Sequence, residues 1–220
     1  DRFPKRCFDV GIAEEHAVGM ASGLAFGGMK PVVALYSTFA QRAIDQMIIN
    51  NALPQADVVF AIDRAGLVGD DGPTHHGMFD LSYLRMIPGM QVLAPSDEAE
   101  LAHALHTALS LKGPCALRYP RGEAPGAAIP LHPQELEPGV SRLVREGSDC
   151  AILAFGRMVA IAQEAAELLA QNNIGCRVVD MRWVKPLDED AVLSAAECGL
   201  VVTLEDNVVS GGAGQGVVSA

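Results

Sequence analysis

Short apolar runs alternate with longer stretches of helical period through the first part of this chain. The apolar runs cover residues 8–12, 31–37, 58–63, 91–94 and 115–119. The clearest helical stretches cover residues 39–51 and 97–111. Strands that are separated by helices usually lie parallel in one sheet, with the helices packed on both of its faces. The alternation therefore predicts an α/β fold with a doubly wound parallel sheet.

A second unit of the same kind is expected after a segment that is dense in proline and glycine, residues 122–138. Such a composition does not support a regular element and is typical of a linker. Beyond it, apolar runs recur at residues 150–156, 176–181 and 200–204, with helical stretches at residues 158–171 and 188–198. We predict a first domain at residues 1–122, a linker at 123–145 and a smaller α/β domain at 146–220. We expect this second domain to be incomplete, because residues 210–216 end where a further helix should begin.

Charge and cysteine content exclude several classes of function. The chain has 16 basic and 27 acidic residues and a formal charge of -11. Nucleic acids and anionic membranes repel such a protein at long range, so neither is expected as a partner. No apolar run reaches the length of a membrane span. The five cysteines form no C-x-x-C pair, so we expect neither a zinc cluster nor a disulfide framework, and we expect a cytoplasmic location.

An acidic segment, GIAEEH at residues 11–16, follows the first apolar run and opens a helix rich in small residues. An acid at such a turn points out of the edge of the sheet, where open α/β sheets bind ligands. Glu14 is therefore a candidate site residue. A structural role is also open, because acids in the first turn of a helix stabilise it by about 0.3–1 kcal/mol.

The loop at residues 63–77 carries an arginine, aspartates and adjacent histidines among glycines. Loops this rich in ionisable groups are either solvated or functional, because they are costly to bury without partners. The pattern favours a functional loop over a solvated turn, and a metal site is the weaker interpretation because no cysteine joins the histidines. His75 or His76 is better suited to moving a proton near neutral pH.

Two further segments carry candidates. In YSTFAQR, residues 36–42, we predict Thr38 as a helix N-cap. Phe39 would lie beside the ligand crevice, although an aromatic residue in this context is more often part of the core. Arg42 indicates an anionic contact. For Arg118 and Arg121, after the last apolar run of the first unit, an anionic ligand and structural salt bridges are equally good explanations.

Taken in order, five blocks of this sequence resemble the 1-deoxy-D-xylulose-5-phosphate synthase family of transketolase-like thiamine diphosphate enzymes. The blocks are residues 9–16, 36–42, 63–75, 79–85 and 118–122. The blocks DRAG at 63–66 and FDLSYLR at 79–85 separate this chain from transketolases and from the β subunits of 2-oxoacid dehydrogenases. The resemblance covers nearly the whole chain, and it implies a pyrimidine-binding domain followed by a transketolase C-terminal-like domain.

The resemblance also implies roles for named side chains. Glu14 would hydrogen-bond the pyrimidine of thiamine diphosphate and so promote deprotonation of its thiazolium ring, and Phe39 would stack on the pyrimidine. His75 would handle a proton of the acceptor or of the intermediate, and Asp71 would orient it. The residues implied for the substrate pocket are Tyr36, Arg42, Arg64 and Arg121. Of these, Arg64 and Arg121 are implied as the clamp for a phosphate.

The family's reaction joins pyruvate and D-glyceraldehyde 3-phosphate with loss of carbon dioxide. The resemblance implies a homodimer, and it places Mg²⁺ and the cofactor's diphosphate on a domain outside this sequence, so we assign no metal ligand here and expect this stretch alone to be inactive. Two alternatives stay open: a β-subunit-like protein of a 2-oxoacid dehydrogenase, and a non-catalytic interaction module of the same fold.

Overall fold

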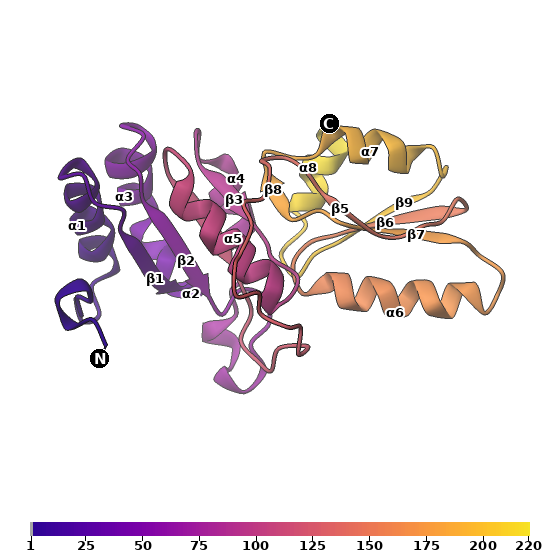
Figure 1. Cartoon of the computed structure of the whole chain (residues 1–220), viewed down its shortest axis with the longest axis horizontal. Coiled ribbons are helices and arrows are strands. Elements are labelled where there is room, and N and C mark those ends of the chain that lie inside the picture. Colours follow the sequence, from indigo (N-terminus) through magenta and orange to yellow (C-terminus); the bar gives the residue numbers. More distant parts are fainter. Residues whose placement is uncertain (1) are drawn as a thin grey trace.

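The computed structural model of the protein describes residues 2–220 and contains two sheets side by side, each with helices on both faces (Figure 1). The first sheet has the strand order β1-β2-β4-β3-β8, and the second has the order β5-β7-β6-β9. Within each sheet the strands are parallel except for one at the edge, since β8 runs antiparallel to β3 and β5 runs antiparallel to β7. The predicted fold class is confirmed.

The elements of the first half are α1 (Glu14–Phe26), β1 (Val32–Tyr36), α2 (Ser37–Ala40), α3 (Ile44–Gln46), β2 (Val59–Asp63), α4 (Asp80–Met86), β3 (Gln91–Leu93), α5 (Glu98–Ser110) and β4 (Cys115–Arg118). Short 3₁₀ turns are η1 (Pro4–Arg6), η2 (Gln41–Ala43), η4 (Gly69–Asp71) and η5 (Pro73–His75), and η3 (Met47–Ala52) is π-helical. The second half contains β5 (Arg142–Arg145), β6 (Cys150–Ala154), α6 (Met158–Ala170), β7 (Cys176–Asp180), β8 (Trp183–Lys185), α7 (Glu189–Ala196), β9 (Val201–Leu204) and α8 (Ala213–Ser219).

Alternate residues of the central strands pack on opposite faces of the first sheet. On one face, Phe60 and Ile62 of β2 belong to a core that also contains residues of α1 and α4. On the other face, Val59 and Ala61 pack with Ala104 and Ala108 of α5. Side chains on a strand alternate between faces, so a strand buried on both sides reads as a continuous apolar run. This explains why β2 was recognisable in the sequence.

The structure corrects three expectations about secondary structure. Residues 8–12 form no strand, and Ile12 is 93 % exposed, because this apolar run has no neighbouring strand to pair with. The helical stretch at residues 39–51 is divided into short α, 3₁₀ and π-helical pieces instead of one helix. The short strands β5 and β8 were not predicted, because three or four residues are too few to show a period.

The second half of the chain completes the sheet of the first. Strand β8 lies after the predicted linker and pairs with β3 through Val92 and Leu93. One continuous apolar core also contains residues from both halves, including Phe60, Leu84, Leu153 and Phe155. Within residues 2–220, no helix combines the length and the apolarity needed to cross a membrane.

Asp188 connects the start of α7 to the start of β5. Its Oδ1 accepts a hydrogen bond from the Ala191 N–H at 2.9 Å, which caps the helix, and its Oδ2 accepts one from the Ser141 N–H at 2.7 Å. Burial alone would raise the pKa of Asp188, but these hydrogen bonds outweigh burial and lower the pKa below its ordinary value of 3.8. The ionised carboxylate is therefore the form that stabilises the fold.

We predict that Asp188→Ala lowers the free energy of unfolding by about 1–2 kcal/mol at pH 7, because a helix cap and a second hydrogen bond are lost. A depressed pKa contributes stability above the unfolded-state value, and this contribution disappears as the pH falls through the folded-state value. The deficit should therefore shrink below about pH 4. Urea denaturation at pH 7 and pH 3 measures it. Asp190→Ala, in the same helical turn, is the control, and an equal deficit at both pH values would contradict the prediction.

Candidate active site

Three strands of the first sheet end at one edge and place polar residues there. Tyr36, the last residue of β1, is in register with Asp63, the last residue of β2. Arg118, the last residue of β4, is in register with Ile62 of β2. In open α/β sheets, ligands bind outside the carboxyl ends of the strands. The candidate residues from separate parts of the sequence therefore meet at this edge.

Glu14 lies at one end of the candidate site, in the first turn of α1. Its side chain is buried, and its Oε1 lies 3.5 Å from Nη1 of the largely exposed Arg42. The positive end of the helix dipole also favours a carboxylate at this position. A buried carboxylate with a single guanidinium beside it can still accept a hydrogen bond from a ligand.

An aromatic cluster adjoins this pair. The Phe39 ring stacks on Tyr36, with ring centroids 5.5 Å apart, and His75 meets its edge at 5.3 Å. The expected N-cap role of Thr38 is wrong, because Thr38 lies inside α2, where its hydroxyl donates to the Thr74 carbonyl at 3.1 Å. The Thr74 hydroxyl in turn lies 3.0 Å from Nδ1 of His75. These contacts hold the histidine beside the phenylalanine.

Asp71 connects two arginines at the other end of the candidate site. Its Oδ2 lies 3.1 Å from Arg64 Nε and 3.3 Å from Arg121 Nε. Arg64 also binds Asp63 at 2.6 Å, and its guanidinium carbon lies 3.8 Å above the Tyr36 ring. Partial desolvation would lower the pKa of Arg64, but the hydrogen bond to Asp71 and the charge of Asp63 raise it instead.

The predicted site residues thus form one continuous series of neighbours. The guanidinium of Arg42 lies 5.3 Å from the centre of the Phe39 ring, which joins the pair at Glu14 to the aromatic cluster. Arg64 over the Tyr36 ring joins that cluster to the aspartate and arginines. The eight side chains to which the resemblance implies a role all belong to this series: Glu14, Arg42, Phe39, Tyr36, His75, Arg64, Asp71 and Arg121.

The loop that carries Asp71 and His75 is closed at its base by two glycines. The Gly66 N–H donates to the Gly77 carbonyl at 2.8 Å, and the Gly77 N–H donates to the Gly66 carbonyl at 2.8 Å. Within the loop, Nδ1 of His76 accepts a hydrogen bond from the Val68 N–H at 3.1 Å. Of the two histidines left open by the sequence, His76 therefore holds the loop together and His75 faces the aromatic cluster.

The sequence left two explanations for Arg118 and Arg121, a structural salt bridge and an anionic ligand, and the structure gives the two residues different surroundings. Arg118 is buried and forms salt bridges to Asp80 and Asp206, so it is structural. Arg121 is 42 % exposed, and its bond to Asp71 uses only Nε. Its two Nη atoms make no hydrogen bond to any other residue that the structure describes, which leaves them able to bind an anion.

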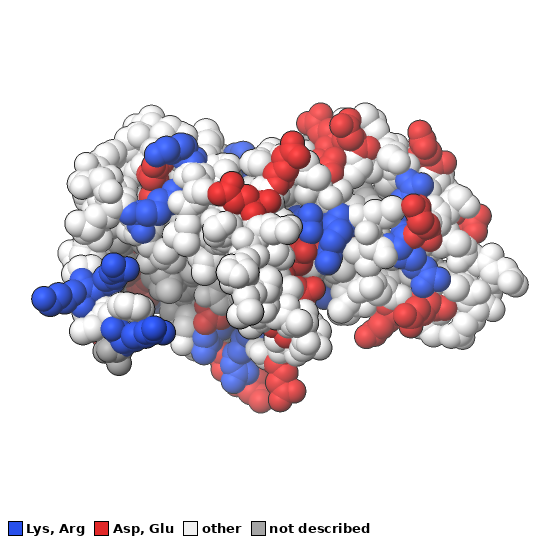
Figure 2. All heavy atoms as spheres, in the orientation of Figure 1, with Lys and Arg blue, Asp and Glu red and all other residues white. Residues whose placement is uncertain are grey.

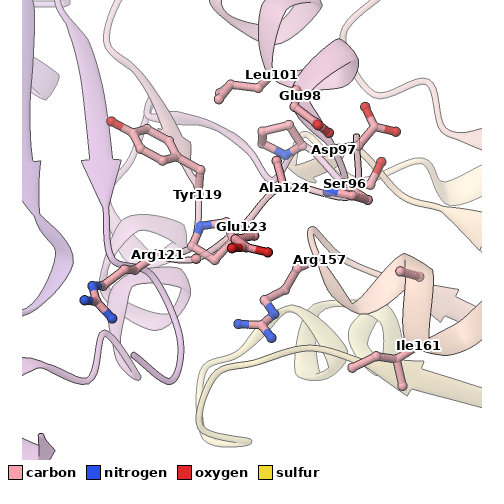
Figure 3. Close-up of a pocket in the computed structure, with 15 residues that line it drawn as sticks. Ser96, Asp97, Glu98, Leu101, Tyr119, Arg121, Glu123, Ala124, Arg157 and Ile161 are labelled. Carbon is pink, nitrogen blue, oxygen red and sulfur yellow. The ribbon is translucent and has the colours of Figure 1, made fainter. Parts of the chain in front are cut away.

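Two cavities, of 430 and 620 Å³, lie between the two halves of the chain at the Arg121 end of the candidate site. Both are lined by Arg121, Arg157 and Ile161. Figure 3 shows Glu123 between Arg121 and Arg157 at the smaller cavity, with the guanidinium of Arg121 pointing away from Arg157. Glu14 and Phe39 line neither cavity, so the cavities extend the arginine end of the site only.

Charge on the visible surface is mixed. Figure 2 shows acidic and basic side chains interspersed on one face, with basic ones gathered at the N-terminal end. In the part of the chain that the structure describes, no group of three or more histidine, cysteine or acidic side chains is arranged to hold a metal ion. The candidate site is built from the buried acid Glu14, an aromatic cluster, and arginines paired with aspartates.

Comparison with protein families now assigns the two halves. The family described as "Transketolase, pyrimidine binding domain" matches residues 1–126, and the family described as "Transketolase, C-terminal domain" matches residues 139–220. The chain belongs to the transketolase family. Within this family, the candidate site lies in the pyrimidine-binding half, and Asp206 and Arg157 come from the C-terminal half.

Curated relatives of this transketolase-family chain carry the name 1-deoxy-D-xylulose-5-phosphate synthase. The relative from Syntrophomonas wolfei is 54% identical over 98% of this chain and 34% of its own length. The relative from Nitrosococcus oceani is 56% identical over 98% of this chain and 33% of its own length. The resemblance predicted from the sequence is confirmed, and the chain spans about a third of the length of the curated relatives it matches.

A solved structure gives the same fold. It is described as a split-gene transketolase in an inactive beta4 tetramer, and it matches with a TM-score of 0.85 and 34% identity. The match covers 99% of this chain and 70% of that one.

Two residues near the candidate site were not singled out from the sequence. Asp63 binds Arg64, and its position as the last residue of a buried strand was a usable signal. Asp206 binds Arg118 across the two halves of the chain. Nothing in the sequence pattern indicated the second pair, because its members are far apart in the chain.

We predict that Gly77→Ala lowers the free energy of unfolding by about 1–3 kcal/mol, as overpacking of a tight contact does. A Cβ at this position would lie 2.5 Å from the Arg64 carbonyl oxygen and would overlap the Ser37 side chain. Gly23→Ala is the control, because its Cβ would meet nothing within 4 Å and alanine favours a helix. Thermal denaturation should show a lower Tm for the first variant and an equal or higher Tm for the second. A Gly77→Ala protein as stable as wild type would disprove the close approach.

Proposed function

We propose that this chain is the pyrimidine-binding and C-terminal part of a 1-deoxy-D-xylulose-5-phosphate synthase. The reaction joins pyruvate and D-glyceraldehyde 3-phosphate and releases carbon dioxide. The observation that carries the proposal is the unbroken series of contacts from Glu14 to Arg121, which connects an acid and an aromatic platform to an anion-binding end. The curated relatives that bear this name support the choice of reaction.

Thiamine diphosphate, when bound, supplies a thiazolium carbon that adds to pyruvate and accepts the electrons released with carbon dioxide. The residues present fit this group. Glu14 is buried, and no hydrogen bond to it comes from the rest of residues 2–220, so its carboxylate can bind a ring nitrogen of the pyrimidine. Phe39 offers an apolar surface that packs against a flat ring and excludes water. We assign Mg²⁺ and the diphosphate to a part of the enzyme outside this sequence.

The arginine end is assigned to the aldehyde substrate. Arg121 has unused N–H groups beside a cavity, and Arg64 is held in place by Asp63 and Asp71. Guanidinium groups bind phosphate through paired hydrogen bonds, and a fixed phosphate orients the aldehyde carbon. Tyr36 supports Arg64 from below, and Arg42 completes the pocket next to Glu14.

His75 is assigned to proton transfer. Its Nδ1 is paired with the Thr74 hydroxyl, so Nε2 is the nitrogen left to exchange a proton with the acceptor or the intermediate. Asp71 contacts Arg64 on its own loop and Arg121 after β4, and by holding both guanidiniums it orients the acceptor. We also infer a homodimer, which the resemblance to the family implies, and a cytoplasmic location, which the five free cysteines favour.

Glu14→Ala in the natural full-length protein should abolish exchange of the thiazolium C2 proton of bound thiamine diphosphate. The reason is that the carboxylate holds the proton on the pyrimidine that makes the amino group of that ring a base. Exchange into deuterium oxide, followed by NMR after quenching, measures the rate. Glu15→Ala removes the neighbouring exposed acid and serves as the control. Retained exchange in the Glu14 variant, with cofactor bound, would remove Glu14 from this role.

Arg121→Ala should raise the KM for D-glyceraldehyde 3-phosphate by about tenfold or more while the KM for pyruvate changes by less than about twofold, because a charged hydrogen bond contributes roughly 1.5–3 kcal/mol. Steady-state kinetics with each substrate varied in turn measures the two constants. Arg157→Ala is the matched control, since Arg157 lines the same cavities without contacting Asp71. Equal increases in both constants would reject the assignment.

A second candidate is one subunit of a split thiamine enzyme, including a β-subunit-like protein of a 2-oxoacid dehydrogenase. The split-gene transketolase structure favours it, because a chain of that kind is described as inactive in its tetramer. A non-catalytic module of the same fold is the third. The gene sequence distinguishes the three. A Gly-Asp-Gly motif with a downstream asparagine in the same chain supports the synthase, and the same motif on a separate chain supports the split enzyme. If neither chain carries the motif, the non-catalytic module is supported. Formation of the five-carbon ketose phosphate from the two substrates is the direct test.

A further inference from the structure

Asp206 follows β9 in the second half of the chain, yet its side chain lies against the loop that carries Asp71 and His75. The side chain is 8 % exposed, and its Oδ1 accepts a hydrogen bond from Arg118 Nη1. Its Oδ2 is buried, with no hydrogen-bond partner in the part of the chain that the structure describes. This oxygen faces Gly66, where a Cβ would overlap it and would lie 3.1 Å from the Asp206 Cβ.

Gly66 is one of the two glycines that close the loop. Its φ is +75°, a conformation that side chains disfavour, and its backbone is paired with Gly77 through two hydrogen bonds of 2.8 Å. Asp71 and His75 both lie between these glycines. A displacement at this base therefore moves both side chains relative to Phe39 and Arg121, which belong to other elements.

The turn at residues 206–208 contacts both sides of the loop base. Asp206 lies on Gly66, and the Val208 N–H donates to the Met78 carbonyl at 3.0 Å, one residue beyond Gly77. The turn is itself held by Arg118, whose Nη2 donates to the Asp206 carbonyl at 3.3 Å. Arg118 is fixed from the other side by Asp80, at 2.9 Å. The loop base thus rests on a buried charged group at the end of the sheet.

We propose that Asp206 is a positioning residue, through which the C-terminal half of the chain holds the 64–77 loop in place against the aromatic cluster. Its contact with the loop is made at Gly66. The effect on the loop stands by itself, whereas the effect on catalysis rests on the proposed function, which gives Asp71 and His75 their roles.

The same interface offers a matched control. The Ser82 hydroxyl on α4 donates to the Ser210 carbonyl at 2.8 Å and accepts from Asn207 Nδ2 at 3.0 Å. These bonds join the two halves of the chain but do not involve Gly66 or Gly77. If joining the two halves of the chain were enough to hold the loop, breaking the Ser82 bonds would also loosen it, so Ser82→Ala tests whether the effect is specific to Asp206.

The first test is amide hydrogen exchange followed by mass spectrometry on the natural full-length protein. Asp206→Ala should increase exchange by about tenfold or more in peptides covering residues 64–79, because local opening becomes easier when a packed contact is removed. Peptides from α5 should be unchanged. Asp206→Asn, which keeps the shape of the side chain, and Ser82→Ala should both exchange in this segment as wild type does.

The proposal is overturned if segment 64–79 is unchanged in Asp206→Ala, or if Ser82→Ala increases its exchange equally. If Asp206→Ala does not fold, Asp206→Ser replaces it, since serine is too short to reach both Arg118 and Gly66. Kinetics form the second test: kcat should fall about tenfold in Asp206→Ala and recover in Asp206→Asn, while the KM for pyruvate stays within about twofold. Increased loop exchange in a protein whose wild type forms no ketose phosphate would refute the proposed function and leave the positioning role standing.

Discussion

The buried guanidinium of Arg118 is the interaction on which the arrangement of the two halves depends. It is 1 % exposed and lies between the carboxylates of Asp80 and Asp206. Burial alone would lower the pKa of Arg118, and the two carboxylates raise it, so the group stays charged. Removing one partner of a buried ion pair costs about 3–5 kcal/mol, because the remaining charge keeps its desolvation penalty without compensation. Arg118 therefore requires both halves of the chain to be in place.

Asp206 shares the single guanidinium of Arg118 with Asp80, and this affects the pKa of Asp206. Burial raises the pKa of Asp206 more than the attraction of Arg118 lowers it. One of its oxygens is bonded and the other is not, and the unbonded oxygen occupies the space that a side chain at Gly66 would need. The position of the Asp206 side chain therefore requires a glycine at residue 66. The ion pair of Arg118 at the end of β4 thus fixes Asp206, and Asp206 in turn packs against the loop that carries Asp71 and His75.

The sequence predicted the parallel strands well, because a strand buried on both faces gives an apolar run. Glycine, proline and polar turn residues mark where each run begins and ends. The prediction failed at residues 8–12, where the same kind of run has no strand to pair with, and at β5 and β8, which are too short to show a period. The candidate site residues were singled out because they follow apolar runs or lie in a glycine-rich loop, and their catalytic roles stay a prediction. Their order in space was not predictable, since stacking of Arg64 on Tyr36 and sharing of Asp71 by two arginines depend on side-chain geometry. Asp206 gave no signal because its contacts are with residues more than eighty positions away.

Under the proposed function, the arginine end attracts an anion within a protein whose formal charge is -11. At physiological ionic strength, charges are screened beyond about 8–10 Å, so distant acids repel an approaching phosphate weakly and nearby guanidiniums dominate. Two of these, Arg64 and Arg121, share a single oxygen of Asp71. Arg64 is also paired with Asp63, so the two carboxylates balance the two guanidiniums and the group as a whole is neutral. Asp71 therefore keeps the arginines together, and attraction of an anion depends on the Nη atoms of Arg121, which extend beyond its contact with Asp71.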